Sequence, residues 1–182
     1  MSLFPETDGK VRAMGSHHST NAITHVWLTP PYIIEALGDF DLDPCAGPEP
    51  RPWPTAKTHW THKDGSLLRP WFGRVWLNPP YGPKESIAPW LRRMAEHGHG
   101  TALIFARTET EIFFDAVWDK ATALHFFKGR LFFYRKDGTL PRADGGSGNA
   151  GAPSVLVAYG AADAAALKRS GLAGKFVPLT GD

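Results

Sequence analysis

Short apolar runs alternate with helical patterns through the middle of the chain. The runs at 40–42, 74–77 and 102–105 fit buried strands, and each precedes a turn or a helical pattern. Apolar side chains recur at helical spacing over residues 85–97 and again over residues 110–118. This alternation predicts right-handed crossovers and an α/β fold with a doubly wound, mainly parallel sheet.

The last third of the chain has a different pattern. Residues 123–127, 131–134 and 154–159 look like strands without helices between them, which predicts an antiparallel C-terminal end to the sheet. Residues 136–152 are rich in Gly and are expected to form a long loop. A loop of this length is uncommon in a small domain and is often functional.

The length and the polar N-terminus predict one folded domain behind a flexible arm. At roughly 150 residues per domain, a chain of 182 residues leaves little room for a second domain. Residues 1–25 lack apolar periodicity and are expected to be a flexible arm. The single domain is therefore expected over residues 26–175.

The composition favours a soluble cytoplasmic protein without a metal. The only cysteine, Cys45, cannot form an internal disulfide, and the chain has no Cys-x-x-Cys pair to hold zinc. Its first 30 residues lack the short apolar core of a secretion signal, and no apolar run approaches the ~20 residues of a membrane span, so no membrane partner is expected. Because the net charge is only +2, any surface that binds nucleic acid must be a local basic patch.

The most informative motif follows the apolar run 75–77 and consists of Asn78, Pro79, Pro80 and Tyr81. The prolines remove amide donors and leave carbonyl acceptors beside the Asn78 side chain. An amino group conjugated to a ring is a poor nucleophile, because its lone pair is delocalised. If Asn78 Oδ1 and the Pro79 carbonyl accepted its two N–H bonds, they would favour a pyramidal nitrogen, while Tyr81 would stack on the ring. Alternatively, the two prolines only end the strand.

A second candidate site follows the run at 40–42, where the sequence reads Asp43, Pro44, Cys45, Ala46, Gly47. Ligands of open α/β sheets bind beyond the carboxyl ends of the strands, where a carboxylate can accept hydrogen bonds from a ribose or an ammonium group. Asp43 is the first choice for that role, although Asp-Pro also starts turns. A glycine-rich G-x-G loop is missing, since Pro48 follows Gly47.

These motifs resemble a known family. Asn78-Pro-Pro-Tyr81 resembles the catalytic motif of amino-group methyltransferases that use S-adenosylmethionine. Its order after Trp27-Leu-Thr29-Pro30 and Asp43-Pro-Cys-Ala resembles the phage-type DNA N6-adenine methyltransferases, the phage Dam family, which is similar to this chain in lacking the G-x-G loop. The resemblance covers about residues 20–160. It implies a class I methyltransferase fold, S-adenosylmethionine as donor, adenine in DNA as acceptor, and a phage or prophage gene.

The resemblance also implies roles for individual residues. The catalytic group would be Asn78, Pro79, Pro80 and Tyr81. The cofactor-binding group would be Trp27, Thr29, Pro30, Asp43, Pro44, Cys45, Ala46, Gly47 and Asp64. The nucleic-acid-binding group would be Arg107, Thr108, Lys128, Arg130, Arg135 and Lys136. The target adenine must leave the duplex to reach Asn78, and the loop at 136–152 is the best candidate for reading the DNA sequence.

Other activities remain open at this point. Cytosine N4 is a possible acceptor, although such enzymes more often carry serine where Asn78 stands. Amino groups in RNA bases and glutamine amides in proteins are also possible, although those enzymes typically have the missing G-x-G loop. A catalytically inactive DNA-binding relative is a further alternative. Cytosine C5 chemistry is disfavoured, because Cys45 belongs to the expected cofactor segment rather than to a nucleophile site.

Overall fold

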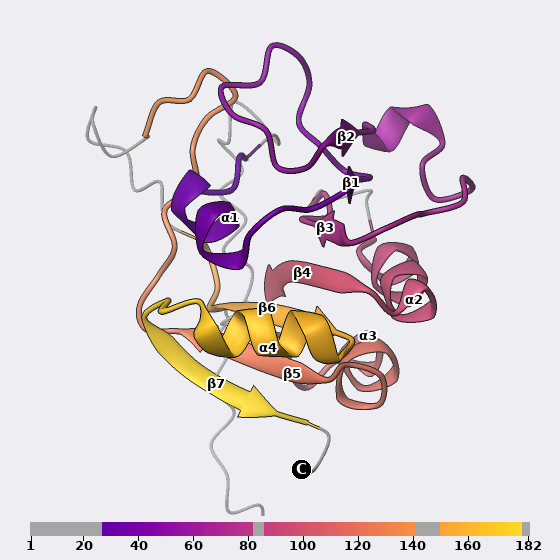
Figure 1. Ribbon diagram of the computed structural model, residues 1–182, viewed down its shortest axis with the longest axis vertical. Helices are drawn as coiled ribbons and strands as arrows, with labels where there is room; N and C mark the ends of the chain where they lie inside the picture. The colour runs from indigo at the N-terminus through magenta and orange to yellow at the C-terminus, as the bar shows by residue number, and fades with distance from the viewer. Residues whose placement is uncertain (1–26, 82–85, 141–149, 180–182) are drawn as a thin grey trace, which may run out of the picture.

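The computed structural model describes residues 27–81, 86–140 and 150–179, which build one seven-stranded mixed sheet. Figure 1 shows the strands one below another in the order β2-β1-β3-β4-β6-β5-β7. The first three pairings in this order are parallel and the last three are antiparallel. The strands are β1 (Leu42–Asp43), β2 (Thr58–His59), β3 (Val75–Leu77), β4 (Gly100–Phe105), β5 (Ala123–Phe127), β6 (Ser154–Tyr159) and β7 (Gly174–Pro178).

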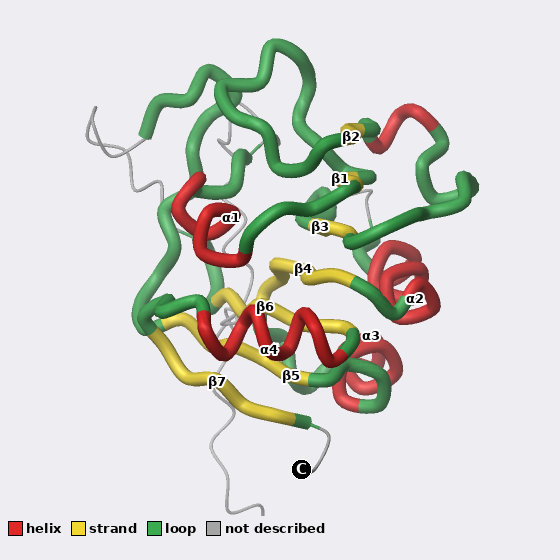
Figure 2. Tube along the Cα trace, viewed as in Figure 1, coloured by secondary structure: helices red, strands yellow, loops and turns green. Residues whose placement is uncertain are grey.

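Described helices lie before β1 and in the connections from β2 to β3, β3 to β4, β4 to β5 and β6 to β7, and long loops surround β1 and β2 (Figure 2). Proline opens the first helix, where its missing N–H costs no intrahelical hydrogen bond. None of the described helices is long and apolar enough to cross a membrane. The helices are α1 (Pro31–Leu37), the 3₁₀ turn η1 (His62–Asp64), α2 (Ala88–His97), α3 (Glu111–Phe113), the π-helix η2 (Phe114–Trp118) and α4 (Ala161–Arg169).

The central strands β3, β4 and β6 are buried on both faces, and their successive residues point to opposite faces. In β3, Val75 and Leu77 join the apolar cluster that α2 and α3 cover. Trp76, between them, joins the cluster that α1 and α4 cover, and its ring lies 5.4 Å from that of Phe40. Two covered faces explain why the central strands are continuously apolar rather than alternating.

The doubly wound arrangement and the antiparallel C-terminal end are confirmed, but the expectation of a mainly parallel sheet is wrong. Three of the six strand pairings are antiparallel: β6 lies between β4 and β5 and runs against both, and β7 runs against β5. All six residues of β6 pair with β4. A strand inserted in this way makes the C-terminal half of the sheet antiparallel.

Most predicted elements are present, with shifts at their ends. Strands β5 and β6 have the predicted bounds, whereas β1 begins at Leu42 instead of residue 40. The predicted helix at 110–118 is present as α3 followed by the π-helix η2. The predicted strand at 131–134 is wrong, because Tyr134 forms only an isolated bridge with Leu28 and this segment does not join the sheet.

Several elements were not predicted. They are α1, β2, η1, α4 and β7, and the last of these pairs with β5 and extends the sheet to Pro178. Of the long loop predicted at 136–152, residues 141–149 lie outside the described part of the chain, and so does the arm predicted at 1–25.

Candidate active site

The topology brings the carboxyl ends of several strands to one edge of the sheet. Strands β1, β3 and β4 are parallel neighbours. Strand β5 runs in the same direction as β4, because both are antiparallel to β6. Asp43 ends β1, Asn78 follows β3, and the segments that begin at Ala106 and Lys128 follow β4 and β5. Ligands of open α/β sheets bind at this kind of edge.

The Asn78 side chain is held by a hydroxyl from the segment before α1. Its Nδ2 donates to Thr29 Oγ1 at 3.3 Å, and Thr29 is buried. This hydrogen bond fixes the plane of the carboxamide and leaves Asn78 Oδ1 as an acceptor. Pro79 is buried directly beside it, and neither Pro79 nor Pro80 has an N–H to compete for the acceptors. The turn therefore presents acceptors in a fixed orientation.

The Tyr81 ring is fixed against the end of β4. Its centroid lies 4.4 Å from that of Phe105, with the planes tilted by 39°. The backbone N–H of Phe105 donates to the Tyr81 hydroxyl at 2.9 Å. Burial raises the pKa of Tyr81 above its ordinary value, so the hydroxyl stays neutral at physiological pH. The aromatic ring of the motif is thus anchored at the junction of β3 and β4.

Asp43 is a buried carboxyl group at the end of β1, with 3% of its surface exposed. The Cys45 N–H donates to its Oδ1 at 2.9 Å, and the Thr55 hydroxyl donates to its Oδ2. Burial raises the pKa of Asp43 from 3.8 to about 6, although these two hydrogen bonds and the positive charge of Arg51 lower it. The carboxylate therefore has fewer donors than its charge requires, and a ligand that supplies more would stabilise it.

The loop between β1 and β2 adds three residues that the sequence patterns did not indicate. Thr55 binds Asp43, and Trp53 Nε1 donates to the backbone carbonyl of Thr29 at 3.0 Å. Arg51 Nε donates to the Gly47 carbonyl at 2.7 Å. Hydrophobic periodicity does not indicate these residues. The chemistry of Asp43 does, because a carboxylate buried after a strand requires hydrogen-bond donors from the segment that follows it.

The other residues predicted to bind a cofactor have different surroundings. Pro30, Pro44 and Ala46 are buried, Cys45 and Gly47 are half-buried, and Trp27 is exposed. Asp64 accepts the Thr61 N–H at 2.7 Å and the Thr61 hydroxyl at 2.9 Å, so it caps the turn η1. These hydrogen bonds lower the pKa of Asp64, whose side chain is exposed. In residues 27–81, 86–140 and 150–179, no three His, Cys, Asp or Glu side chains are grouped so that they could hold a metal.

The residues predicted to bind nucleic acid follow β4 and β5. Four cations are exposed, and Arg135 is half-buried. The Thr108 carbonyl accepts a hydrogen bond from Trp118 Nε1 at 3.2 Å, which fixes the turn after β4. The backbone N–H of Lys128 donates to the carbonyl of Ala173 at 3.0 Å, which fixes the end of β5. The exposed cations are Arg107, Lys128, Arg130 and Lys136.

Comparison with known proteins adds one match. A family model described as DNA N-6-adenine-methyltransferase (Dam) matches residues 16–160. The matched region contains Thr29, Asp43 and the Asn78 motif, and it ends before α4 and β7. No curated protein and no solved structure matches the chain.

Proposed function

The chain belongs to the DNA N6-adenine methyltransferase (Dam) family, and on that basis we propose that the edge at Asp43 and Asn78 transfers a methyl group from S-adenosylmethionine to N6 of an adenine flipped out of DNA. Adenine-specific methylation of DNA is the activity of this family. The single observation that carries the proposal is the Asn78–Thr29 hydrogen bond at 3.3 Å, which joins the predicted catalytic turn to the predicted cofactor segment.

The residues after β1 fit S-adenosylmethionine. When bound, this molecule supplies an electrophilic methyl group on a sulfonium. Asp43 has a pKa raised to about 6 by burial, and an ammonium or hydroxyl donor beside it would stabilise its charged form. Thr29, Pro30, Pro44, Cys45, Ala46 and Gly47 would line the same site, with Trp27 at its exposed rim. Asp64 would bind the adenine end of S-adenosylmethionine. To do so, it would have to keep or exchange its hydrogen bonds to Thr61.

Asn78 and Pro79 would prepare the amino group for attack. Asn78 Oδ1 and the Pro79 carbonyl would accept the two N–H bonds, which favours a pyramidal nitrogen with its lone pair directed at the methyl group. The bond from Asn78 Nδ2 to Thr29 keeps the carboxamide from rotating. Transfer would form the N6–methyl bond, break the sulfonium–methyl bond and leave a neutral thioether. The methylated nitrogen would be positively charged until it released a proton to solvent, and both acceptors would stabilise that charge. Holding the amine in this geometry supplies most of the rate.

Tyr81 would hold the flipped base by stacking. Its ring is already fixed by Phe105, so little conformational freedom is lost when the base arrives. Base–aromatic stacking contributes about 1–3 kcal/mol. The exposed Arg107, Lys128 and Arg130 would bind phosphates of the strand, because they follow strands that end at the same edge.

Identification of the methylated product tests the proposal. The full chain is incubated with S-adenosylmethionine that carries a labelled methyl group and, separately, with DNA, RNA and a mixture of proteins. The DNA is digested to nucleosides, and the labelled nucleoside is identified by mass spectrometry. We expect N6-methyldeoxyadenosine in the DNA sample alone. Label in N4-methyldeoxycytidine, in RNA or in protein, with none in deoxyadenosine, would overturn it.

A further inference from the structure

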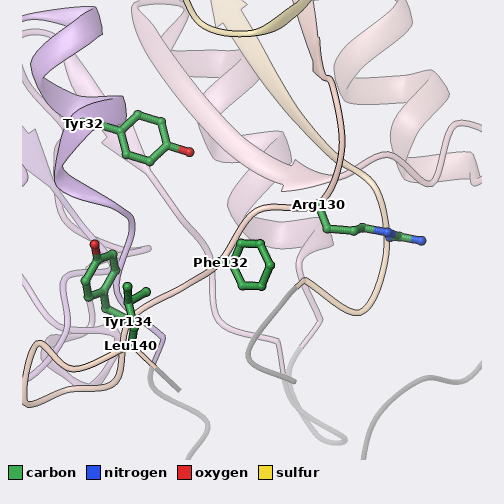
Figure 3. A pocket seen from close by; sticks show the side chains of 5 residues that line it. All are labelled: Tyr32, Arg130, Phe132, Tyr134 and Leu140. Atoms are coloured by element: carbon green, nitrogen blue, oxygen red, sulfur yellow. The ribbon is translucent and has the colours of Figure 1, made fainter. Parts of the chain in front are cut away.

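Aromatic rings line an open pocket of about 210 Å³ beside the proposed active site. Figure 3 shows Tyr32 on α1 facing Phe132 and Tyr134, which come from the segment after β5. Both tyrosine hydroxyls are directed into the space between the rings, whereas the Arg130 side chain extends away from it. Leu140 completes the lining.

Hydrogen bonds connect this pocket to Asn78. Tyr134 and Leu28 exchange two backbone hydrogen bonds of 2.8 and 3.0 Å. The next residue, Thr29, accepts the hydrogen bond from Asn78 Nδ2. Trp53 contacts both sides, since its indole N–H donates to Thr29 and its ring lies edge-on to Tyr134 with centroids 5.0 Å apart. The position of the pocket relative to the catalytic turn is therefore fixed.

The lining suits one nucleobase. Pockets for whole drug-sized ligands measure about 300–1,000 Å³, so the volume here matches a single ring system better than a larger ligand. Tyr32 is 49% exposed and can bury more of its ring against a flat ligand. The hydroxyls of Tyr32 and Tyr134 can hydrogen-bond to polar atoms at the edge of a base. None of the five lining residues carries a negative charge, and Arg130, whose exposed side chain extends out of the pocket, would meet the phosphate outside it rather than the base.

The orientation of Asn78 separates this pocket from the position of the target adenine. Its Nδ2 is directed at Thr29, which adjoins the pocket, so Oδ1 at the other end of the carboxamide faces a different direction. The ring that would stack on the target, Tyr81, lies against Phe105 on β4. The target amino group must approach Oδ1, and its ring must reach Tyr81. The pocket beyond Thr29 is left for another base.

We propose that the pocket formed by Tyr32, Phe132 and Tyr134 binds the base of a nucleotide that neighbours the target adenine in the same strand, with Arg130 on its phosphate. This inference rests on the proposed function. A second base held in this way would keep the strand from returning to the duplex and would fix the register of the target. Tyr32, Phe132 and Tyr134 would thus be positioning residues rather than catalytic ones.

The inference is tested by removing a base from the DNA and an aromatic ring from the pocket, separately and together. Once product mapping has identified a methylated adenine, that adenine and each of its neighbours in the strand are replaced in turn by an abasic residue. Binding and kcat are measured for the wild type and for Tyr32→Leu and Phe132→Leu. Phe114→Leu is the matched control, because Phe114 is 53% exposed on η2, away from the pocket. Binding of S-adenosylmethionine by each variant shows that it is folded.

We expect one neighbouring position at which the abasic residue weakens binding by about five-fold or more for the wild type and for Phe114→Leu. The Tyr32→Leu and Phe132→Leu variants should already bind intact DNA more weakly and should be insensitive to the abasic residue at that position. Equal sensitivity of all proteins at every neighbouring position would overturn the inference. The inference would also be overturned if Tyr32→Leu and Phe132→Leu lost their sensitivity to an abasic residue at the target position itself, because the pocket would then hold the target adenine. Absence of any methylated adenine with the wild type would instead refute the proposed function.

Discussion

Asp43→Asn should abolish the pH dependence that the buried Asp43 carboxyl imposes on stability. Asparagine has nearly the same shape, and it can still accept the Cys45 N–H and donate to the Thr55 hydroxyl. The substitution therefore removes the charge and keeps the two hydrogen bonds. In the native protein, burial raises the pKa of Asp43 from 3.8 to about 6.

The expected magnitude follows from that shift. A difference of about two pKa units at 1.36 kcal/mol each gives about 3 kcal/mol between the ends of the titration. Because the folded pKa is the higher one, the native state binds more protons than the unfolded state between pH 4 and 6, so stability falls as the pH rises through this range. At pH 5 the unfolded carboxyl is already ionised, and about 1.4 kcal/mol of the loss remains between pH 5 and 8.

Urea unfolding at several pH values between 5 and 8 measures this loss. The free energy of unfolding of Asp43→Asn, relative to the wild type, should rise by about 1.4 kcal/mol from pH 5 to 8. Burial lowers the pKa values of His59 and His125, so these groups add stability as the pH rises, but their contributions cancel in the difference. Asp41→Asn is the control, because hydrogen bonds lower the pKa of Asp41 and its effect should not vary above pH 5. A difference between Asp43→Asn and wild type that stays constant with pH would refute the reasoning.

Substitutions at Tyr81, Asp163 and Arg107 test other parts of the structure. Tyr81→Phe should keep kcat, because the ring remains, but it should lower the free energy of unfolding by about 1 kcal/mol, because the Phe105 N–H loses its acceptor; a large loss of kcat would contradict this. Asp163→Ala should cost about 3–5 kcal/mol in urea unfolding, because Asp163 is fully buried and its Oδ1 binds Arg74 Nε at 2.7 Å; a cost below 1 kcal/mol would exclude this role. Arg107→Gln should reduce the slope of log affinity against log salt for DNA by about one, and an unchanged slope would show that Arg107 binds no phosphate.

The sequence predicted the parts of the fold that depend on strong local patterns. Strands β5 and β6 have the predicted ends, because buried β-branched and aromatic runs have few alternatives. The segment at 131–134 shows the limit of this reasoning. It has the composition of a strand, but its backbone pairs with Leu28 rather than with the sheet, and such a partner depends on tertiary contacts. Helix α4 was not predicted, because its many alanines give only a weak apolar face.

The candidate site was predictable where a motif follows a strand. The positions of Asn78 and Asp43 at one edge follow from parallel strands, since their carboxyl ends meet. The bond between Asn78 and Thr29 spans 49 residues, and no local pattern could indicate it. Trp53 and Thr55 belong to an irregular loop, so their contacts with Thr29 and Asp43 appear only once the loop is folded.

The central claim is that the turn at Asn78 activates the N6 amino group of adenine in DNA. The most direct measurement compares the wild type with Asn78→Ala under single-turnover conditions, with S-adenosylmethionine saturating and N6-methyldeoxyadenosine quantified by mass spectrometry. The account predicts product with the wild type, and a variant that binds the donor equally well but forms product more slowly by orders of magnitude. Equal rates for the two proteins would contradict it.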